Sequence, residues 1–543
     1  MTRHFIPPEP KNEPILSYAP HSQERKNLKE AIQQILKSDP VKIPVVIGEE
    51  EIQTDERTTN VCPHDHRHVL ASISVANEEL VMDAIENALE AKKKWLGSSF
   101  EERALVFLKA AELLSKKYRY RINAASILCL SKSVFQAEID SACELIDFLK
   151  FNVSYAAQLY KMQPYSPEGQ INRLIYRPLE GFVFAASPFN FVAIAGNLAT
   201  SPAIMGNVVI FKPASSAVFP AYVFHEILRE AGLPPGVINF VPGRGSTVGE
   251  VVLKHPQLGG IHFTGSTSTF RHMWKKVGEN IANYVSYPRL VGETGGKDFI
   301  FIHSSADVET AVTATVRGAF ELQGQKCSAV SRVYCPSDLW PKYKRRLLET
   351  LKTVKMGSPV DFENLVNAVI DEAAFDKIVS YINYAKKSSE LEIIFGGNAN
   401  KDKGYFVEPT VVVTRNPKSK LMEEEIFGPV VTIFVYDPNK YEETLSLCDQ
   451  TSQYGLTGAI LAQDREAIIK AREILYYAAG NFFVNDKPTG AVVGQQPFGG
   501  SRMSGTNDKS GSLLNLIRWV APQTVKETFS PPADYRYPFM AES

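Results

Sequence analysis

The sequence predicts an α/β protein with two large domains, the first of them built on a doubly wound parallel sheet. Its 543 residues exceed the roughly 250–300 residues that a single hydrophobic core usually organises. Short apolar runs alternate with helical stretches from residue 181 onward, and a second series of the same kind starts near residue 299. This alternation is typical of βαβ units, whose parallel strands are buried on both faces.

Amphipathic helices are predicted before the first series of strands. Over residues 77–96, Asn77 can cap the helix, glutamates in the first turn suit its positive N-terminal end, and apolar residues recur along one face as far as Leu96. Residues 101–117 and 134–160 have a similar pattern. These helices can cover a sheet formed by the strands that follow.

The first series of apolar runs predicts the strands of the first domain, at residues 181–186, 207–211, 237–241 and 260–263. In a sheet of this type the ligand lies at the carboxyl ends of the strands. Asn190, Lys212 and Gly265 end or follow three of these runs. We therefore expect all three residues at the ligand-binding edge.

The second series predicts another α/β domain, with strands at residues 299–302, 332–335, 392–395, 411–413, 430–435 and 481–484. Residues 171–178, a hairpin-like segment, and the tail after Ile517 fit neither domain. Exposed strands of this kind often pair with another subunit. We expect a first domain of residues 1–160 and 181–292, a second of residues 293–515, and a small β oligomerisation element of residues 161–180 and 516–543.

Composition disfavours several classes of protein. The chain is 44% hydrophobic and 22% charged with a formal net charge of −1, which gives no electrostatic footprint for nucleic acid or an anionic membrane. No apolar run approaches the roughly 20 residues of a membrane-spanning helix. The six cysteines include no Cys-x-x-Cys pair, so a reducing compartment fits best. We expect a small-molecule partner, no nucleic acid and no membrane; any organelle signal is short, already removed or absent.

Three residues supply the parts that thiol chemistry on a carbonyl requires. Cys327 lies among glycines and small hydroxyl residues beside a lysine, a poor setting for a core strand and a good one for a nucleophile. Placement at a helix N-terminus would lower its pKa. Glu293 can act as the base and Asn190 as the oxyanion donor. The alternative for a lone cysteine is a filler of the core.

Other motifs each have a plain structural alternative. Residues 263–267 close a strand and open a helix whose free N–H groups could face a pyrophosphate, or they form an ordinary turn. The glycines of 243–249 lack dinucleotide spacing, and Lys212 could bond ribose hydroxyls or be solvated. An acidic run such as residues 423–425 usually lies in solvent. Residues 62–68 combine Cys, His and Asp but are too closely spaced for zinc, so we expect a polar turn and no metal.

Together these motifs resemble those of the aldehyde dehydrogenase superfamily, over about residues 40 to 528. The resemblance rests on Cys327, Glu293, Asn190, Lys212, Phe263-Thr264-Gly265-Ser266 and Glu425-Ile426-Phe427-Gly428-Pro429. Residues 320–329, 485–500 and 504–509 are similar to the branch of the superfamily that acts on glutamate γ-semialdehyde.

The resemblance implies an aldehyde-dehydrogenase-like fold, with an NAD-binding domain, an α/β catalytic domain and NAD as cofactor. It implies that Cys327 adds to the aldehyde, that the Asn190 side chain and the Cys327 N–H hold the oxyanion, and that Glu293 activates water. Cofactor contacts are implied for Ser187, Lys212, Gly265, Ser266, Thr267, Glu425 and Phe427. Substrate contacts are implied for Ser328, Gly490, Ala491, Phe191 and Phe498.

Two positions depart from the family pattern. Ala491 stands where relatives can have serine, which removes a hydroxyl but keeps the backbone N–H. Ser215, three residues after Lys212, replaces the glutamate that many members use on the adenosine ribose. The first departure leaves the exact carboxylate contacts open, and the second leaves the preference for NAD over NADP open.

The resemblance further implies oxidation of glutamate γ-semialdehyde to glutamate in proline breakdown, in a homodimer or larger homo-oligomer of the mitochondrial matrix. Three other hypotheses remain at this stage. The chain could act on another semialdehyde such as succinic semialdehyde. The same thiol, base and oxyanion donor could serve a cofactor-independent thioesterase or esterase. A non-catalytic binding protein could retain the fold, although the intact catalytic residues disfavour this.

Overall fold

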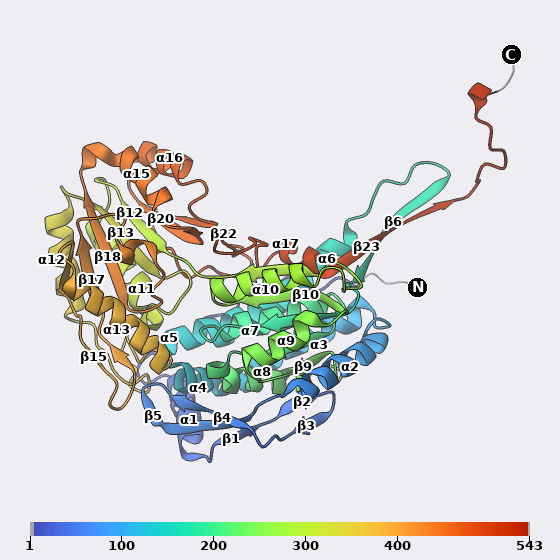
Figure 1. The fold of residues 1–543 in the computed structure, drawn as a ribbon, viewed down its shortest axis with the longest axis horizontal. Helices are drawn as coiled ribbons and strands as arrows, with labels where there is room; N and C mark the ends of the chain where they lie inside the picture. The colour runs from blue at the N-terminus through green and yellow to red at the C-terminus, as the bar shows by residue number, and fades with distance from the viewer. Residues whose placement is uncertain (1–4, 541–543) are drawn as a thin grey trace.

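The computed structural model describes residues 5–540 and has two lobes, each built around a seven-stranded sheet. Figure 1 shows the first lobe in blue to green and the second in yellow to orange, with a two-stranded ribbon projecting from the body. The α/β class predicted from the alternating runs is confirmed. Within residues 5–540, no helix combines the length and the apolar character needed to cross a bilayer.

The first sheet has the strand order β11-β10-β7-β8-β9-β2-β3. Its strands are β11 (Arg289–Glu293), β10 (Leu258–Thr264), β7 (Phe182–Ala186), β8 (Val209–Lys212), β9 (Ile238–Phe240), β2 (Val45–Ile47) and β3 (Glu50–Ile52). The strands from β11 to β9 are parallel. The antiparallel pair β2 and β3, which the sequence did not predict, forms the far edge.

Helices cover both faces of this sheet, as a doubly wound fold requires. Phe184 and Ile210 pack on one face with helices α2 (Glu78–Trp95), α9 (Gly245–Lys254) and α10 (Thr267–Glu279). Alternate residues such as Phe211 pack on the other face with α7 (Val192–Ile204) and α8 (Val218–Ala231). Side chains point to opposite faces along a strand, so each buried run fills two cores.

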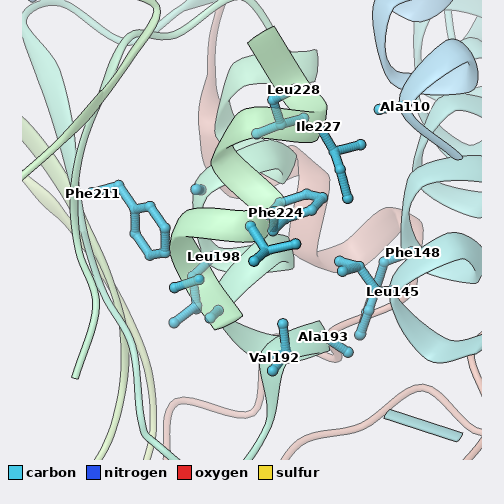
Figure 2. Close-up of a cluster of buried hydrophobic side chains, with 14 of the residues drawn as sticks. Ala110, Leu145, Phe148, Val192, Ala193, Leu198, Phe211, Phe224, Ile227 and Leu228 are labelled. Atoms are coloured by element: carbon cyan, nitrogen blue, oxygen red, sulfur yellow. The ribbon is translucent and has the colours of Figure 1, made fainter. Parts of the chain in front are cut away.

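The second of these cores is the larger, and Figure 2 shows its centre. Phe211 from the sheet faces Leu198 of α7 and Phe224 of α8, while Leu145 comes from the next layer. That layer contains α3 (Phe100–Leu113), α4 (Arg119–Leu130), α5 (Val134–Ala137) and α6 (Leu145–Lys161), with π-helical turns at Leu114–Tyr118 and Glu138–Glu144. The helices predicted at 101–117 and 134–160 thus form, and the 77–96 helix is α2, capped by Asn77. Leu96 is its C-cap and is 50% exposed, so its predicted place on the buried face was wrong.

The second sheet has the order β14-β17-β18-β13-β12-β20-β21. Its strands are β14 (Leu391–Phe395), β17 (Thr410–Thr414), β18 (Val430–Tyr436), β13 (Val330–Pro336), β12 (Asp298–Ile302), β20 (Thr457–Leu461) and β21 (Asn481–Val484). Only β14 pairs antiparallel within the sheet. The helices around it are α11 (Val308–Phe320), α12 (Trp340–Leu351), α13 (Glu372–Lys387), α14 (Lys420–Glu423), α15 (Tyr441–Gln450) and α16 (Arg465–Ile474).

The projecting ribbon pairs β6 (Gln170–Pro178) with β23 (Val520–Thr528) in antiparallel register. The hairpin-like segment and the C-terminal tail expected from the sequence are therefore the two strands of one ribbon (Figure 1).

Before the first sheet, α1 (Gln23–Lys37) is followed by a small sheet of β1 (Val41–Ile43), β4 (Arg57–Cys62) and β5 (Asp65–Ser74). The short helix α17 (Leu513–Leu516) packs on α6.

Candidate active site

Cys327 lies in a turn between α11 and β13, and the main chain before it is strained. Leu322 and Gln323 have φ of 51° and 56°, a left-handed conformation that non-glycine residues rarely adopt. The Gln323 side chain holds this turn in place: Nε2 donates to the carbonyls of Ser131 (3.1 Å) and Ala368 (2.9 Å). A buried amide with these partners can stabilise a backbone that would otherwise relax. The hydrogen bonds of the Gln323 side chain thus hold the nucleophile loop in place.

The thiol does not have the environment that its sequence neighbours predicted. α11 ends at Phe320, so Cys327 follows a helix C-terminus and gains nothing from a helix N-terminus. The adjacent Lys326 is turned away and pairs with Glu321 at 3.3 Å. Burial raises the pKa of Cys327, and the nearby carboxylates, including Glu293, raise it further. The thiol therefore needs a base to form its thiolate.

Glu293 is the last residue of β11, and its carboxyl group faces the same cavity as Cys327. Burial raises the pKa of Glu293 to about 8; the charge of Asp508 adds to this, while the Gly500 N–H bond and Lys509 oppose it. The Gly500 N–H donates to Glu293 Oε2 at 2.9 Å. A carboxyl group with this pKa can exchange protons near neutral pH.

Asn190 follows β7 and lies beside the nucleophile loop. Its Nδ2 donates to the Gln325 carbonyl at 3.0 Å. Asp140 fixes the adjoining helix start, because its carboxylate accepts from the N–H groups of Val192 (3.0 Å) and Ala193 (2.9 Å). The strand end and the capped helix together hold the Asn190 amide next to the thiol loop.

Gly296 allows the loop after Glu293 and the Cys327 loop to touch. A Cβ atom on Gly296 would lie 2.1 Å from the Cys327 carbonyl oxygen. The Gly296 N–H donates to Glu425 Oε1 at 2.9 Å. Glu425 is therefore turned inward, while Glu423 and Glu424 are exposed, so the acidic run is only partly the solvated one expected.

The predicted cofactor residues divide between the two lobes. Ser187, Lys212 and Gly265 lie at the carboxyl ends of the neighbouring strands β7, β8 and β10, as expected. Ser266 caps α10, and Thr267 Oγ1 donates to the Tyr454 hydroxyl at 3.2 Å. Glu425 and Phe427 come from the second lobe, where the Phe427 ring meets Phe189 edge to face at 5.9 Å between ring centres.

This edge suits a dinucleotide. The buried Ser187 hydroxyl has no hydrogen-bond partner in residues 5–540. Among the described residues, Lys212 Nζ donates only to the adjacent Pro213 carbonyl (3.1 Å), and burial lowers the pKa of Lys212 to about 8. Free polar groups at strand ends and a helix N-terminus are what the hydroxyl and phosphate groups of a nucleotide need.

A cavity of about 350 Å³ brings the predicted substrate residues together. Seven predicted site residues line it: Glu293, Cys327, Ser328, Gly490, Ala491, Phe191 and Phe498. The Ser328 and Thr489 hydroxyls form a hydrogen bond at 2.9 Å. Gly490 has φ of 93°, which brings the backbone of its loop to the cavity wall without a side chain. The volume is within the usual range for a small-molecule site.

The family follows from comparison with known proteins. The model of the aldehyde dehydrogenase family matches residues 51–524. The chain belongs to this family. A curated relative from Dictyostelium discoideum, named Delta-1-pyrroline-5-carboxylate dehydrogenase, mitochondrial, is 52% identical over 538 residues, covering 98% of this chain and 96% of the relative. The human protein of the same name is 48% identical over 97% of this chain and 94% of its own.

Solved structures agree with this assignment to the aldehyde dehydrogenases. The Delta-pyrroline-5-carboxylate dehydrogenase from Mycobacterium tuberculosis, bound with NAD, has a TM-score of 0.96 at 48% identity, with complete coverage (100%) of both chains. The 1-pyrroline-5-carboxylate dehydrogenase from Thermus with bound NAD has a TM-score of 0.90 at 32% identity, covering 97% of this chain and 100% of that one.

Sequence reasoning missed several residues in the cavity of this aldehyde dehydrogenase. Glu144, at the end of the π-helical turn before α6, and Asp147, in α6, line it together with Asn12 and Glu13 from the N-terminal segment. Burial raises the pKa of Glu144 to about 8, and Asp140 adds to this. These residues carry no motif, and only the folded chain places them beside Cys327.

Only Pro63 and His64 form a turn between β4 and β5, and both are buried; Cys62 ends β4 and residues 65–68 begin β5, so the polar turn expected over 62–68 is much shorter than predicted. His64 is buried and its Nδ1 lies 3.3 Å from the Ser131 hydroxyl. Across residues 5–540, no group of three or more His, Cys, Asp or Glu side chains is placed to share a metal ion.

Proposed function

We propose that this aldehyde dehydrogenase oxidises L-glutamate γ-semialdehyde, the open form of Δ1-pyrroline-5-carboxylate, to L-glutamate with NAD, a step of proline catabolism. The observation that carries the proposal is the shared cavity: the thiol of Cys327, the carboxyl of Glu293 and the loop at Gly490 all face it. The named relatives, which match almost the whole chain, support the same substrate.

The reaction starts at Cys327. Its sulfur gives its proton to the Glu293 carboxylate, which passes it on to solvent. The sulfur bonds to the aldehyde carbon as the C=O electron pair moves to the oxygen, and the resulting oxyanion accepts hydrogen bonds from the Asn190 amide and the Cys327 N–H. NAD, when bound, supplies the acceptor for the hydride that leaves this carbon. The substrate carbon remains on Cys327 as a thioester. Glu293 then takes a proton from a water molecule, whose oxygen bonds to the thioester carbon and releases glutamate and the thiol.

The residues at the far end of the cavity suit the two charged groups of the substrate. The α-carboxylate needs hydrogen-bond donors, and Ser328 with the backbone at Gly490 and Ala491 supplies them. The α-ammonium needs an acceptor, which Glu144 supplies when ionised. Phe191 and Phe498 enclose the aliphatic chain between these ends.

NAD would be held by residues from both lobes. Ser187, Lys212 and the turn 265–267 would bind its ribose and phosphate groups, and Glu425 with Phe427 would hold the nicotinamide half. The NAD-binding domain then comprises residues 1–160 and 181–292, and the catalytic domain residues 293–515. Ser215 is exposed, and its carbonyl accepts from Asn60 Nδ2 at 2.7 Å. Because this residue is serine and not glutamate, no carboxylate at this position opposes the 2′-phosphate of NADP.

The projecting ribbon and the names of the relatives bear on the assembly and the compartment of the enzyme. The oligomerisation element, residues 161–180 and 516–543, contains the projecting ribbon of β6 and β23, and it joins subunits into a homodimer or larger homo-oligomer. Eukaryotic relatives are named mitochondrial, and the enzyme acts in the mitochondrion, within the matrix. Sedimentation of the wild type and of Ile175→Asp, a change on the exposed face of β6, tests the assembly: a wild-type monomer contradicts it.

A steady-state assay tests the reaction. Formation of NADH from NAD, or of NADPH from NADP, is measured with glutamate semialdehyde and with succinic semialdehyde. We expect the highest kcat/KM with glutamate semialdehyde and NAD, and no NADH formation by Cys327→Ala. A higher kcat/KM with succinic semialdehyde overturns the substrate, and acyl ester turnover without aldehyde oxidation favours an esterase.

A further inference from the structure

The N-terminal segment contributes to the wall of the substrate cavity. Residues 5–19 form no helix or strand, yet Asn12, Glu13 and Ile15 line the cavity that contains Cys327. This segment belongs to the first lobe by sequence and lies far from the nucleophile along the chain. Its place in the cavity requires specific contacts with the elements around it.

Asn12 makes those contacts through every polar atom of its side chain. Its Nδ2 donates to Asp147 Oδ2 (2.8 Å) and to the Val493 carbonyl (2.8 Å). Its Oδ1 accepts from Gln495 Nε2 at 3.0 Å. Nδ2 thus binds both α6 and the loop that follows Ala491, and Oδ1 binds the same loop a second time.

The segment is held firmly on its other side as well. The Glu13 N–H donates to Asp147 Oδ1 at 2.8 Å. The Glu13 carboxylate pairs with Arg119 (2.8 Å) and Lys150 (2.7 Å), and the Arg119 and Glu13 side chains are only 6% and 8% exposed. Separating a buried ion pair leaves an uncompensated charge and is costly, so the chain next to Asn12 is held in place.

The loop that Asn12 holds presents main chain to the cavity. Gly490 and Ala491 have no polar side chain, so a carboxylate that reaches these two residues binds their N–H groups. The loop also contains Gly494, with φ of 83°, and a Cβ there would lie 2.2 Å from the Phe151 ring of α6. The loop therefore rests against α6, and Asn12 joins the two by hydrogen bonds.

We infer that Asn12 is a positioning residue for the carboxylate end of the substrate. It fixes the 490–496 loop to α6, so that the N–H groups of that loop keep the spacing that a carboxylate needs. Preorganised donors of this kind bind an anion without a cost for ordering the loop. The inference rests on the proposed function, because it requires a substrate with a carboxylate.

The test compares two aldehydes in wild type and Asn12→Ala. Glutamate semialdehyde carries the charged groups, and pentanal has a similar chain without them. We expect the preference for glutamate semialdehyde, as a ratio of kcat/KM values, to fall about tenfold in Asn12→Ala, because all three side-chain hydrogen bonds are lost. The change should lie in KM for glutamate semialdehyde, with kcat nearly kept. Asn398→Ala, whose exposed side chain donates to Glu408 (3.0 Å), is the matched control and should keep the wild-type ratio.

A second variant covers the case in which Asn12→Ala does not fold. Gln495 is exposed at the rim of the cavity, so Gln495→Ala removes the bond to Asn12 Oδ1 without emptying a buried site, and it should lower the ratio about two- to threefold. Weaker binding of glutamate in calorimetry, with NAD binding kept, supports the same role. A wild type without preference for glutamate semialdehyde overturns the proposed function. A wild-type preference that persists in the folded variants, or a proportional loss on both aldehydes, overturns only the role of Asn12.

Discussion

Asn190 Nδ2 donates a hydrogen bond to the carbonyl oxygen of Gln325 at 3.0 Å. Gln325 lies two positions before Cys327 in the nucleophile loop, so this bond joins the amide from the first lobe to the thiol from the second. An amide nitrogen carries two protons. One is used in this bond, and the other can bind the oxygen of an aldehyde attached to Cys327.

Asn190→Ala should therefore lower kcat by about 10²–10³-fold, the usual effect of removing one oxyanion donor. KM for NAD should change little, because Asn190 is not among the residues proposed to hold the cofactor. Steady-state kinetics measure both values, and a thermal melt establishes that the variant is folded. A kcat close to that of the wild type would assign the oxyanion to other donors.

The pH dependence follows from Glu293. Burial raises the pKa of Glu293 to about 8, and the carboxyl group must be ionised to take a proton from water. The ionised fraction grows as pH rises, so kcat should increase with pH and level off above a midpoint near this value. The raised pKa of Cys327 acts in the same direction. A kcat that is flat between about pH 6 and about pH 9 contradicts a rate-limiting role for this base.

Two adjacent residues should move this midpoint in opposite directions. Asp508 raises the pKa of Glu293 and Lys509 lowers it, because a like charge disfavours the carboxylate and an opposite charge favours it. Asp508→Asn should shift the kcat midpoint to lower pH, and Lys509→Met should shift it to higher pH. Each variant is the control for the other. Shifts in the same direction would show that rearrangement, and not charge, moves the midpoint.

Stability should depend strongly on the buried pair of Lys132 and Asp140. Both side chains have 0% exposure, and Asp140 also caps α7. Asp140→Asn leaves the Lys132 ammonium without its partner, so the free energy of unfolding should fall by about 3–5 kcal/mol. Denaturant titration measures this change. Lys132→Met added to Asp140→Asn should recover part of the loss; if it does not, the cap of α7 accounts for the effect.

Most of the sheet was predictable because central parallel strands are buried on both faces. The run 182–186 is apolar throughout, and 430–435 is apolar except for Thr432; this pattern identifies both strands. β20 was missed, since Thr457 to Leu461 mixes small residues with apolar ones, and β2 and β3 are only three residues long. Short edge strands depend on their neighbours for pairing and carry little signal of their own.

The site was predictable as far as motifs extend. Cys327, Glu293 and the Gly490 loop lie at one cavity as expected, because each belongs to a recognisable stretch of sequence. The environment of the thiol was not predictable: Lys326 is next to it in sequence, but its side chain turns to Glu321. Asn12 and Glu144 could not be found either, since their importance lies in contacts between distant parts of the chain.

The contact at Gly296 has a consequence for redesign. A Cβ atom there would lie 2.1 Å from the Cys327 carbonyl oxygen and 2.3 Å from Asp298 Oδ2, so neither loop can be diversified independently. Libraries that seek new aldehyde specificity should leave this junction untouched and vary the opposite wall, at Phe191, Ala491 and Phe498. The catalytic residues then stay unchanged in every variant, while the range of aldehydes that the cavity accepts is altered.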